Sequence, residues 1–70
     1  MLTGTRLENT RIYNRKIIIE VIRRNSPISR AEIAQQTGLT TATISNLTAE
    51  LLEEEFIVEI GRRKGLRGQP

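Results

Sequence analysis

The segment SRAEIAQQTG, residues 29–38, marks both ends of a short helix more clearly than any other part of the chain. Ser29 can accept a hydrogen bond from the backbone N–H groups that are free at a helix N-terminus. Glu32 can accept one from the Ser29 amide in return, which is the pattern of a capping box. Gly38 readily adopts the positive φ that ends a helix. The segment is therefore predicted to be a helix. Its inward-facing residues should be Ile33, Ala34 and Thr37.

A second helix is predicted directly afterwards, over residues 39–55, with Thr40 as its N-cap. Ile44, Leu47 and Leu51 recur at i, i+3 and i+7, a spacing that turns them toward a core. The opposite face is small and uncharged, and it carries Ala42, Ser45, Asn46 and Ala49. A short capped helix, a glycine turn and a helix with small polar residues near its N-terminus together predict a helix-turn-helix.

Residues 10–24 predict another helix before this pair. Ile18, Val21 and Ile22 fall on one stripe, and the Asn-Ser-Pro sequence that follows ends the helix. Ile12 and Ile19 lie off the stripe. They could complete the core or form a contact between two copies of the chain.

The C-terminal residues predict a small sheet. Residues 56–60, FIVEI, favour a strand because they are rich in β-branched and aromatic side chains. Pro27-Ile28 could supply a small strand that pairs with it. The basic stretch from residue 61, GRRKGLRGQP, would then be a wing.

The predicted fold is mainly α: a three-helix winged helix-turn-helix with a short, incomplete β-wing. Its expected parts are an N-terminal arm at residues 1–9, the domain at 10–61, and a basic wing at 62–70 that stops before its return strand. Because a wing without a return strand lacks its antiparallel partner, residues 62–70 are expected to be mobile.

The composition argues against several classes of protein. Seventy residues make one domain at most. The chain has no histidine, cysteine or aspartate, so the usual nucleophile–base pairs and zinc ligands are missing. We predict no enzyme activity, no cofactor and no metal. Neither an apolar run long enough to span a membrane nor a signal peptide is present, which predicts a soluble, cytoplasmic protein.

The charge is unevenly distributed. Residues 1–30 carry net +5, residues 31–49 carry −1, residues 50–60 carry −5 and residues 61–70 carry +4, although the whole chain carries only +3. Two basic ends suit a polyanion such as nucleic acid. Ordinary solubilising charge is the alternative interpretation.

The stretch NSPISRAEIAQQTGLTTATISNLTAELLEEEFIVEIG resembles the N-terminal DNA-binding region of the ROK family of bacterial regulators, the xylose and glucose repressor type. The resemblance covers roughly residues 14–70. MarR-type winged helices share the general pattern, but the Ser-Arg start is more characteristic of this family. Gln69 departs from the family pattern, which has a basic residue there. The matching motifs are Pro27-Ile28-Ser29-Arg30, Gly38-Leu39-Thr40, Thr43-Ile44-Ser45, Glu50-Leu51-Leu52, Ile57-Val58-Glu59-Ile60-Gly61 and Arg67-Gly68-Gln69-Pro70.

Together with the chemistry of the side chains, the resemblance implies sequence-specific binding to duplex DNA, with the helix at 40–55 in the major groove. Asn46 is the best candidate for a bidentate contact with adenine. Arg30 at the start of its helix would meet a phosphate, and the basic wing would reach a flanking minor groove. The predicted DNA-binding residues are Arg30, Thr40, Thr41, Ala42, Thr43, Ser45, Asn46, Arg62, Arg63, Lys64 and Arg67.

The resemblance also implies a sugar-responsive regulator, usually a repressor, that acts as a homodimer in the intact protein. Its sugar inducer would bind a C-terminal, sugar-kinase-like domain, so the seventy residues would be one domain or fragment of a longer protein. Two alternatives remain open: a winged helix that binds only other proteins, and an RNA-binding domain. RNA binding is disfavoured because one tyrosine and one phenylalanine offer little stacking surface.

Overall fold

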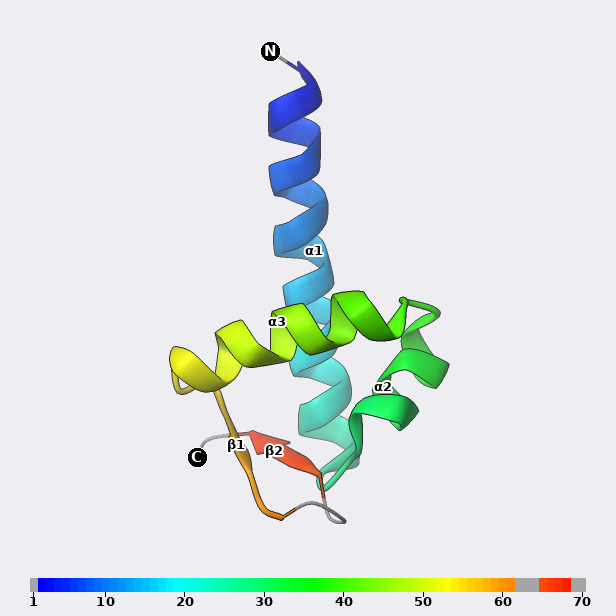
Figure 1. Ribbon diagram of the computed structural model, residues 1–70, viewed down its shortest axis with the longest axis vertical. Coiled ribbons are helices and arrows are strands. Elements are labelled where there is room, and N and C mark those ends of the chain that lie inside the picture. The colour runs from blue at the N-terminus through cyan, green and yellow to red at the C-terminus, as the bar shows by residue number, and fades with distance from the viewer. Residues whose placement is uncertain (1, 62–64, 69–70) are drawn as a thin grey trace.

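The computed structural model describes residues 2–61 and 65–68, and the side chains of residues 9–61 and 65–68. Three helices and a two-stranded sheet make up the fold (Figure 1). The predicted winged helix-turn-helix architecture is confirmed. In chain order the elements are α1 (Leu2–Asn25), α2 (Arg30–Thr37), α3 (Thr41–Glu53), β1 (Ile57–Glu59) and β2 (Leu66–Gly68).

The ends of α2 and the start of α3 are capped as the sequence predicts. Ser29 Oγ accepts a hydrogen bond from the Glu32 amide at 3.1 Å, and Glu32 Oε1 accepts one from the Ser29 amide at 3.0 Å. The hydrogen bond from the Ser29 backbone lowers the pKa of the Glu32 carboxyl. Gly38 ends α2 with φ 75°, and Thr40 Oγ1 accepts from the Thr43 amide at 3.1 Å. These caps leave only Gly38 to Thr40 between the two helices.

At its C-terminus, α3 ends at Glu53 rather than at residue 55. Phe56 donates from its backbone amide to the Leu51 carbonyl at 2.9 Å, and Glu55 donates to the Leu52 carbonyl at 3.1 Å. This pair of bonds is a Schellman motif, which needs a left-handed residue after the cap. Glu55 occupies that position with φ 65°. Because glycine usually fills it, the sequence gives no local signal for the end of this helix.

The sheet corrects the prediction of an incomplete wing. β1 and β2 pair antiparallel, in the register Ile57↔Gly68, Val58↔Arg67 and Glu59↔Leu66. The return strand is therefore present within the chain. Ile28 adds an isolated bridge to Leu66, as expected for the residues before α2. The missing partner strand, which was the reason to expect mobility at 62–70, is present for Leu66–Gly68. Residues 62–64 and 69–70 lie outside the described residues.

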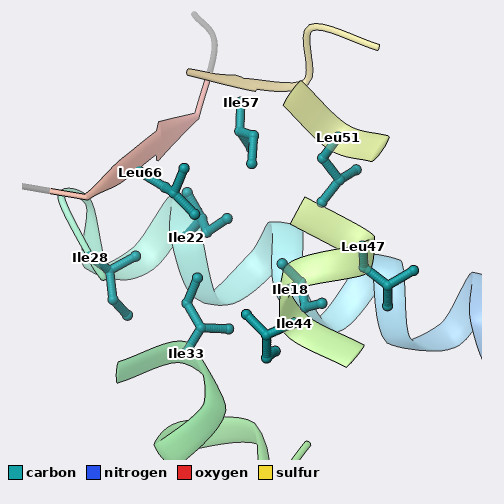
Figure 2. Packing of buried hydrophobic residues seen from close by; sticks show 9 residues of the cluster. All are labelled: Ile18, Ile22, Ile28, Ile33, Ile44, Leu47, Leu51, Ile57 and Leu66. Carbon is teal, nitrogen blue, oxygen red and sulfur yellow. The ribbon is translucent and has the colours of Figure 1, made fainter. Parts of the chain in front are cut away.

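The buried core joins all five elements. Its side chains come mainly from the stripes predicted for α1 and α3, together with one residue each from α2, β1, β2 and the segment before α2 (Figure 2). Thr48 is also fully buried, and its hydroxyl donates to the Ile44 carbonyl at 2.7 Å. Ile19 packs against the core, whereas Ile12 is 48% exposed. The buried hydrophobic residues are Ile18, Ile22, Ile28, Ile33, Ile44, Leu47, Leu51, Ile57 and Leu66.

The first helix is longer than predicted. It starts at Leu2 rather than at residue 10, so most of the expected N-terminal arm is helical. Figure 1 shows α1 crossing α3 and continuing well beyond it. The side chains of residues 9–13 are all exposed, so this part of α1 lacks the apolar stripe by which a sequence indicates a packed helix. No helix in the described residues is long and apolar enough to cross a membrane.

Candidate nucleic-acid interface

The outer face of α3 is small, uncharged and exposed. Because Ile44, Leu47, Thr48 and Leu51 turn inward, the residues between them point to solvent. Among the described residues, the side chains of Ser45 and Asn46 have no hydrogen-bond partner, so their donors and acceptors are available to a ligand. The exposed residues of this face are Thr41, Ala42, Ser45, Asn46 and Ala49, as predicted.

Thr40 and Thr43 hold the start of α3 in place. The Thr40 hydroxyl accepts from the Thr43 amide and donates to Thr43 Oγ1 at 2.9 Å. Thr40 is exposed and Thr43 is partly buried. Both side chains are therefore already bonded to each other, and they fix the N-terminal turn that would enter a groove.

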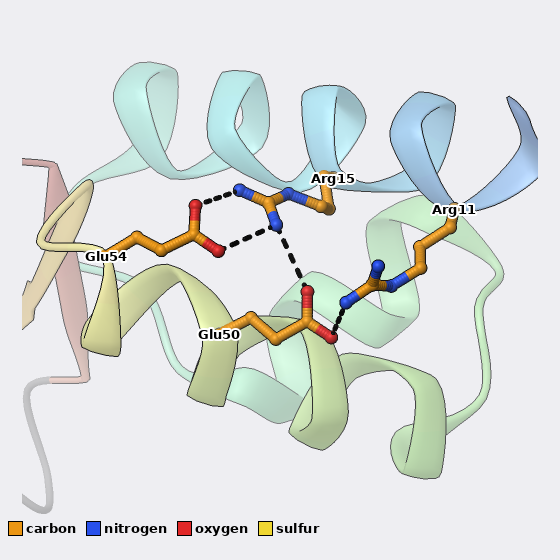
Figure 3. A network of polar contacts seen from close by, with 4 residues as sticks. All are labelled: Arg11, Arg15, Glu50 and Glu54. Carbon is orange, nitrogen blue, oxygen red and sulfur yellow. Dashed lines mark hydrogen bonds and ion pairs between the residues drawn. The ribbon is translucent and has the colours of Figure 1, made fainter. Parts of the chain in front are cut away.

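An ion-pair network ties α3 to α1, and sequence reasoning did not find it (Figure 3). Arg15 donates to both oxygens of Glu54 through its two terminal guanidinium nitrogens, Nη2 at 2.6 Å and Nη1 at 3.0 Å. Nη1 also donates to Glu50 at 3.1 Å. Arg11 forms an ion pair with the other oxygen of Glu50. The available signal was spacing: two arginines at i and i+4 on α1, and two glutamates at i and i+4, one on α3 and one at its C-cap.

The network changes the charge that α3 presents. Hydrogen bonding to Arg11 lowers the pKa of the Glu50 carboxyl, and hydrogen bonding to Arg15 lowers that of Glu54. The same bonds raise the pKa values of both guanidinium groups. Each carboxylate is thus charged but paired. The acidic half of α3 consequently repels a polyanion less than its sequence suggests.

The basic residues outside α3 that were predicted to bind DNA differ in their surroundings. Arg30 at the start of α2 forms an ion pair with Glu59 of β1 at 3.1 Å, which joins α2 to the wing. Arg67 is exposed on β2. The remaining predicted wing residues, Arg62, Arg63 and Lys64, lie outside the described residues.

A groove of about 490 Å³ separates α3 from the N-terminal half of α1. Thr10, Arg11 and Asn14 of α1 face Thr43, Asn46 and Glu50 of α3 across it. Two of the α3 residues are predicted to contact DNA, so the groove borders the outer face of α3. In the part of the chain that the structure describes, no cluster of His, Cys, Asp or Glu side chains could hold a metal ion.

A capped helix pair with an uncharged outer face, beside a two-stranded wing, defines a small DNA-binding module. The chain belongs to the winged helix-turn-helix DNA-binding family, whose sequence profile matches residues 13–58. This confirms the predicted class.

Curated relatives align with most of this chain. It is 38% identical over 56 residues to the xylose repressor of Bacillus subtilis (strain 168), covering 80% of this chain and 15% of that protein. Identity is 39% over 56 residues with the xylose repressor of Caldicellulosiruptor bescii, covering 80% and 14%. The uncharacterized protein y4fQ of Sinorhizobium fredii is 40% identical over 57 residues, covering 81% and 14%.

These matches confirm the resemblance to repressors of the xylose type. The chain spans only 14–15% of the length of these curated relatives. No solved structure matches the chain at a significant level.

Proposed function

We propose that this chain is the DNA-binding domain of a bacterial, sugar-responsive transcriptional repressor. The observation that carries the proposal is the outer face of α3, on which Asn46 offers a free side-chain amide among small neutral neighbours. Such a face can enter a major groove about 12 Å wide without steric or charge conflict. The relatives named xylose repressors support the regulatory role and the response to a sugar.

Within this interface the residues divide into two kinds. Asn46 reads a base by donating to and accepting from adenine, and Ala42 or a threonine methyl contacts a thymine methyl. The hydroxyls of Thr41 and Ser45 bond to phosphates and fix the position of α3. Arg67 and the basic residues at 62–64 act on the flanking minor groove, where narrow A·T tracts attract arginine.

Arg30 is not free to meet a phosphate alone, as the sequence led us to expect. Its ion pair with Glu59 directs it along the wing, so a phosphate contact has to form beside this carboxylate. A phosphate and Glu59 can share the guanidinium because it has several donors in a fixed fork. Arg30 then links the placement of the wing to the placement of α2 on the DNA.

The intact protein would bind as a homodimer in the bacterial cytoplasm, and its sugar inducer would bind outside these seventy residues. The location of the inducer site is consistent with the alignments, in which the chain matches only 14–15% of the length of its curated relatives. Dimeric helix-turn-helix proteins place their two reading helices on half-sites about 34 Å apart.

Substitution of Asn46 by alanine tests the base-reading role. Sites selected from a random-sequence duplex pool should show one strongly preferred adenine with the wild-type chain. That preference should disappear with Asn46→Ala, for a loss of about 1–3 kcal/mol of discrimination. Gln35→Ala on α2, another exposed amide, is the matched control and should select the wild-type site. Identical selected sites for wild type and Asn46→Ala would refute base reading by Asn46. Absence of salt-dependent DNA binding by the wild type would favour a protein-binding module.

A further inference from the structure

The N-terminal half of α1 stands beside the face of α3 that is proposed to read DNA. Figure 1 shows this half of α1 extending past α3, on the side away from α2 and the wing. Its described side chains, from Asn9 to Tyr13, are exposed and take no part in the core. Burial of apolar side chains therefore does not explain why the helix continues this far.

The groove between the two helices carries unused hydrogen-bonding groups. Asn14 of α1 and Asn46 of α3 both line its walls. Among the described residues, neither side-chain amide has a hydrogen-bond partner, and Asn14 is only partly exposed. Arg11 borders the same groove with a side chain that is 55% exposed, paired to Glu50. The groove thus combines free N–H donors with an ion pair, in which Arg11 offsets the charge of Glu50.

The size of a helix in a major groove indicates what enters this space. A helix with its side chains is about 10–12 Å across, so in a major groove about 12 Å wide it has a phosphate strand on each side. The element next to the outer face of α3 must lie against one of these strands. On one side of α3 that element is the N-terminal half of α1.

We propose that the groove between α1 and α3 receives the phosphate strand that borders the major groove, with the Asn14 amide donating to a phosphate oxygen. This inference rests on the proposed function, because it takes α3 as the reading helix. Continuity supports it: Asn46 and Thr43 belong both to the outer face of α3 and to the wall of the groove.

Asn14 would then help to position the protein on the DNA without recognising particular bases. Contacts with phosphates fix register and orientation and carry no direct base information. A change at Asn14 should therefore weaken binding to all duplexes alike, whereas a change at Asn46 should alter which duplex is preferred. This contrast separates the two residues experimentally, although they share one groove.

The test uses two substitutions of Asn14 in the seventy-residue chain. The probes are a duplex selected from a random-sequence pool and a scrambled duplex of the same composition. Asn14→Asp introduces a negative charge with little change in size or helix propensity, and should weaken binding to both duplexes about tenfold by like-charge repulsion. That deficit should shrink as the salt concentration rises. Asn14→Lys should steepen the slope of log K against log salt by about 0.9.

Gln36→Glu on α2 is the matched control, because it makes the same chemical change beside Asn25 and away from the groove. Thermal melts establish that each variant is folded. If Asn14→Asp and Asn14→Lys both bind like the wild type while Asn46→Ala still changes the selected site, the inference about α1 is wrong and the proposed function stands. If the wild-type chain binds neither duplex, both are wrong.

Discussion

Gly38 and Gly65 have similar backbone angles, with φ of 75° and 85°, but different surroundings. A Cβ atom added to Gly38 would meet no atom within 4 Å. Added to Gly65, it would lie 2.2 Å from the Ile28 carbonyl oxygen and 2.5 Å from the carbonyl carbon. Leu66 causes this close approach, because it exchanges backbone hydrogen bonds of 3.1 and 2.7 Å with Ile28. Gly38 thus needs glycine for its conformation alone, and Gly65 needs it also for space.

Alanine substitutions should reveal this difference. Gly38→Ala should lower the free energy of unfolding by about 1 kcal/mol, the cost of a left-handed alanine. Gly65→Ala adds a clash with backbone that cannot rotate away, and should cost about 3 kcal/mol or more. Urea unfolding followed by circular dichroism measures both values. Equal losses at the two positions would mean that the bridge between Ile28 and Leu66 contributes little to stability.

The difference between local and long-range constraints also explains which residues could be predicted from the sequence. Ser29, Glu32 and Thr40 bond to atoms within three residues of themselves, so their roles follow from local spacing. The exposure of Asn46 follows from its place opposite the apolar stripe of α3. Gly65 is constrained by Ile28, which is close only in the folded chain. The partners of Arg15 are likewise distant in sequence, and spacing alone does not specify which helices meet.

At the scale of elements, both ends of α2 and the start of α3 were predictable because capping residues within each segment encode these boundaries. Neither β2 nor the start of α1 has that property. β2 has a single apolar residue, Leu66, and becomes a strand because β1 and Ile28 offer it backbone partners on both sides. The first turns of α1 face solvent, so no apolar periodicity distinguishes them from an arm.

The contact between α1 and α3 should depend on pH. The native pKa values of Glu50 and Glu54 are lower than usual, because the carboxylates accept hydrogen bonds from Arg11 and Arg15. The unfolded chain therefore takes up protons first as the pH falls. The stabilisation is complete above the ordinary glutamate pKa of about 4.3, and it is lost as the pH falls through the lower native values.

Thermal melts between pH 7 and pH 3 measure this loss. The melting temperature of the wild type should fall below a pH of about 4.3. The double variant with Glu50→Gln and Glu54→Gln should show a shallower fall, since it lacks the shifted groups. Glu53→Gln is the control for the loss of a carboxylate, because Glu53 has no ion pair among the described residues. A double variant with the wild-type profile would show that these ion pairs do not stabilise the native state.

At the scale of the whole molecule, α3 lies between two projecting parts, the N-terminal half of α1 and the wing (Figure 1). The wing was predicted as a part of the site, but not its closure by β2. The role now proposed for α1 was not predicted, because it depends on the path of a helix and not on a motif. Among the described residues, Arg11 lies on the N-terminal half of α1 and Arg67 on the wing, so a basic residue is present on each of the two projecting parts.

If α3 is the reading helix, as proposed, each copy of the chain has one, so an operator with two half-sites needs two copies. If the dimer contact of the intact protein lies outside these residues, the chain alone should occupy two half-sites independently, with equal intrinsic affinities.

Joining two copies by a Gly/Ser linker of about 40 residues, which spans about 35 Å, makes the second binding event intramolecular. Affinity should then rise about 10²–10⁴-fold, and it should be highest when the half-sites are about 10–10.5 base pairs apart, on one face of the duplex. Fluorescence anisotropy titrations on duplexes with varied spacing measure this. Strong cooperativity between unlinked copies would instead place the dimer contact within this chain, where Ile12 and Phe56, 48% and 51% exposed, are the apolar residues to substitute next.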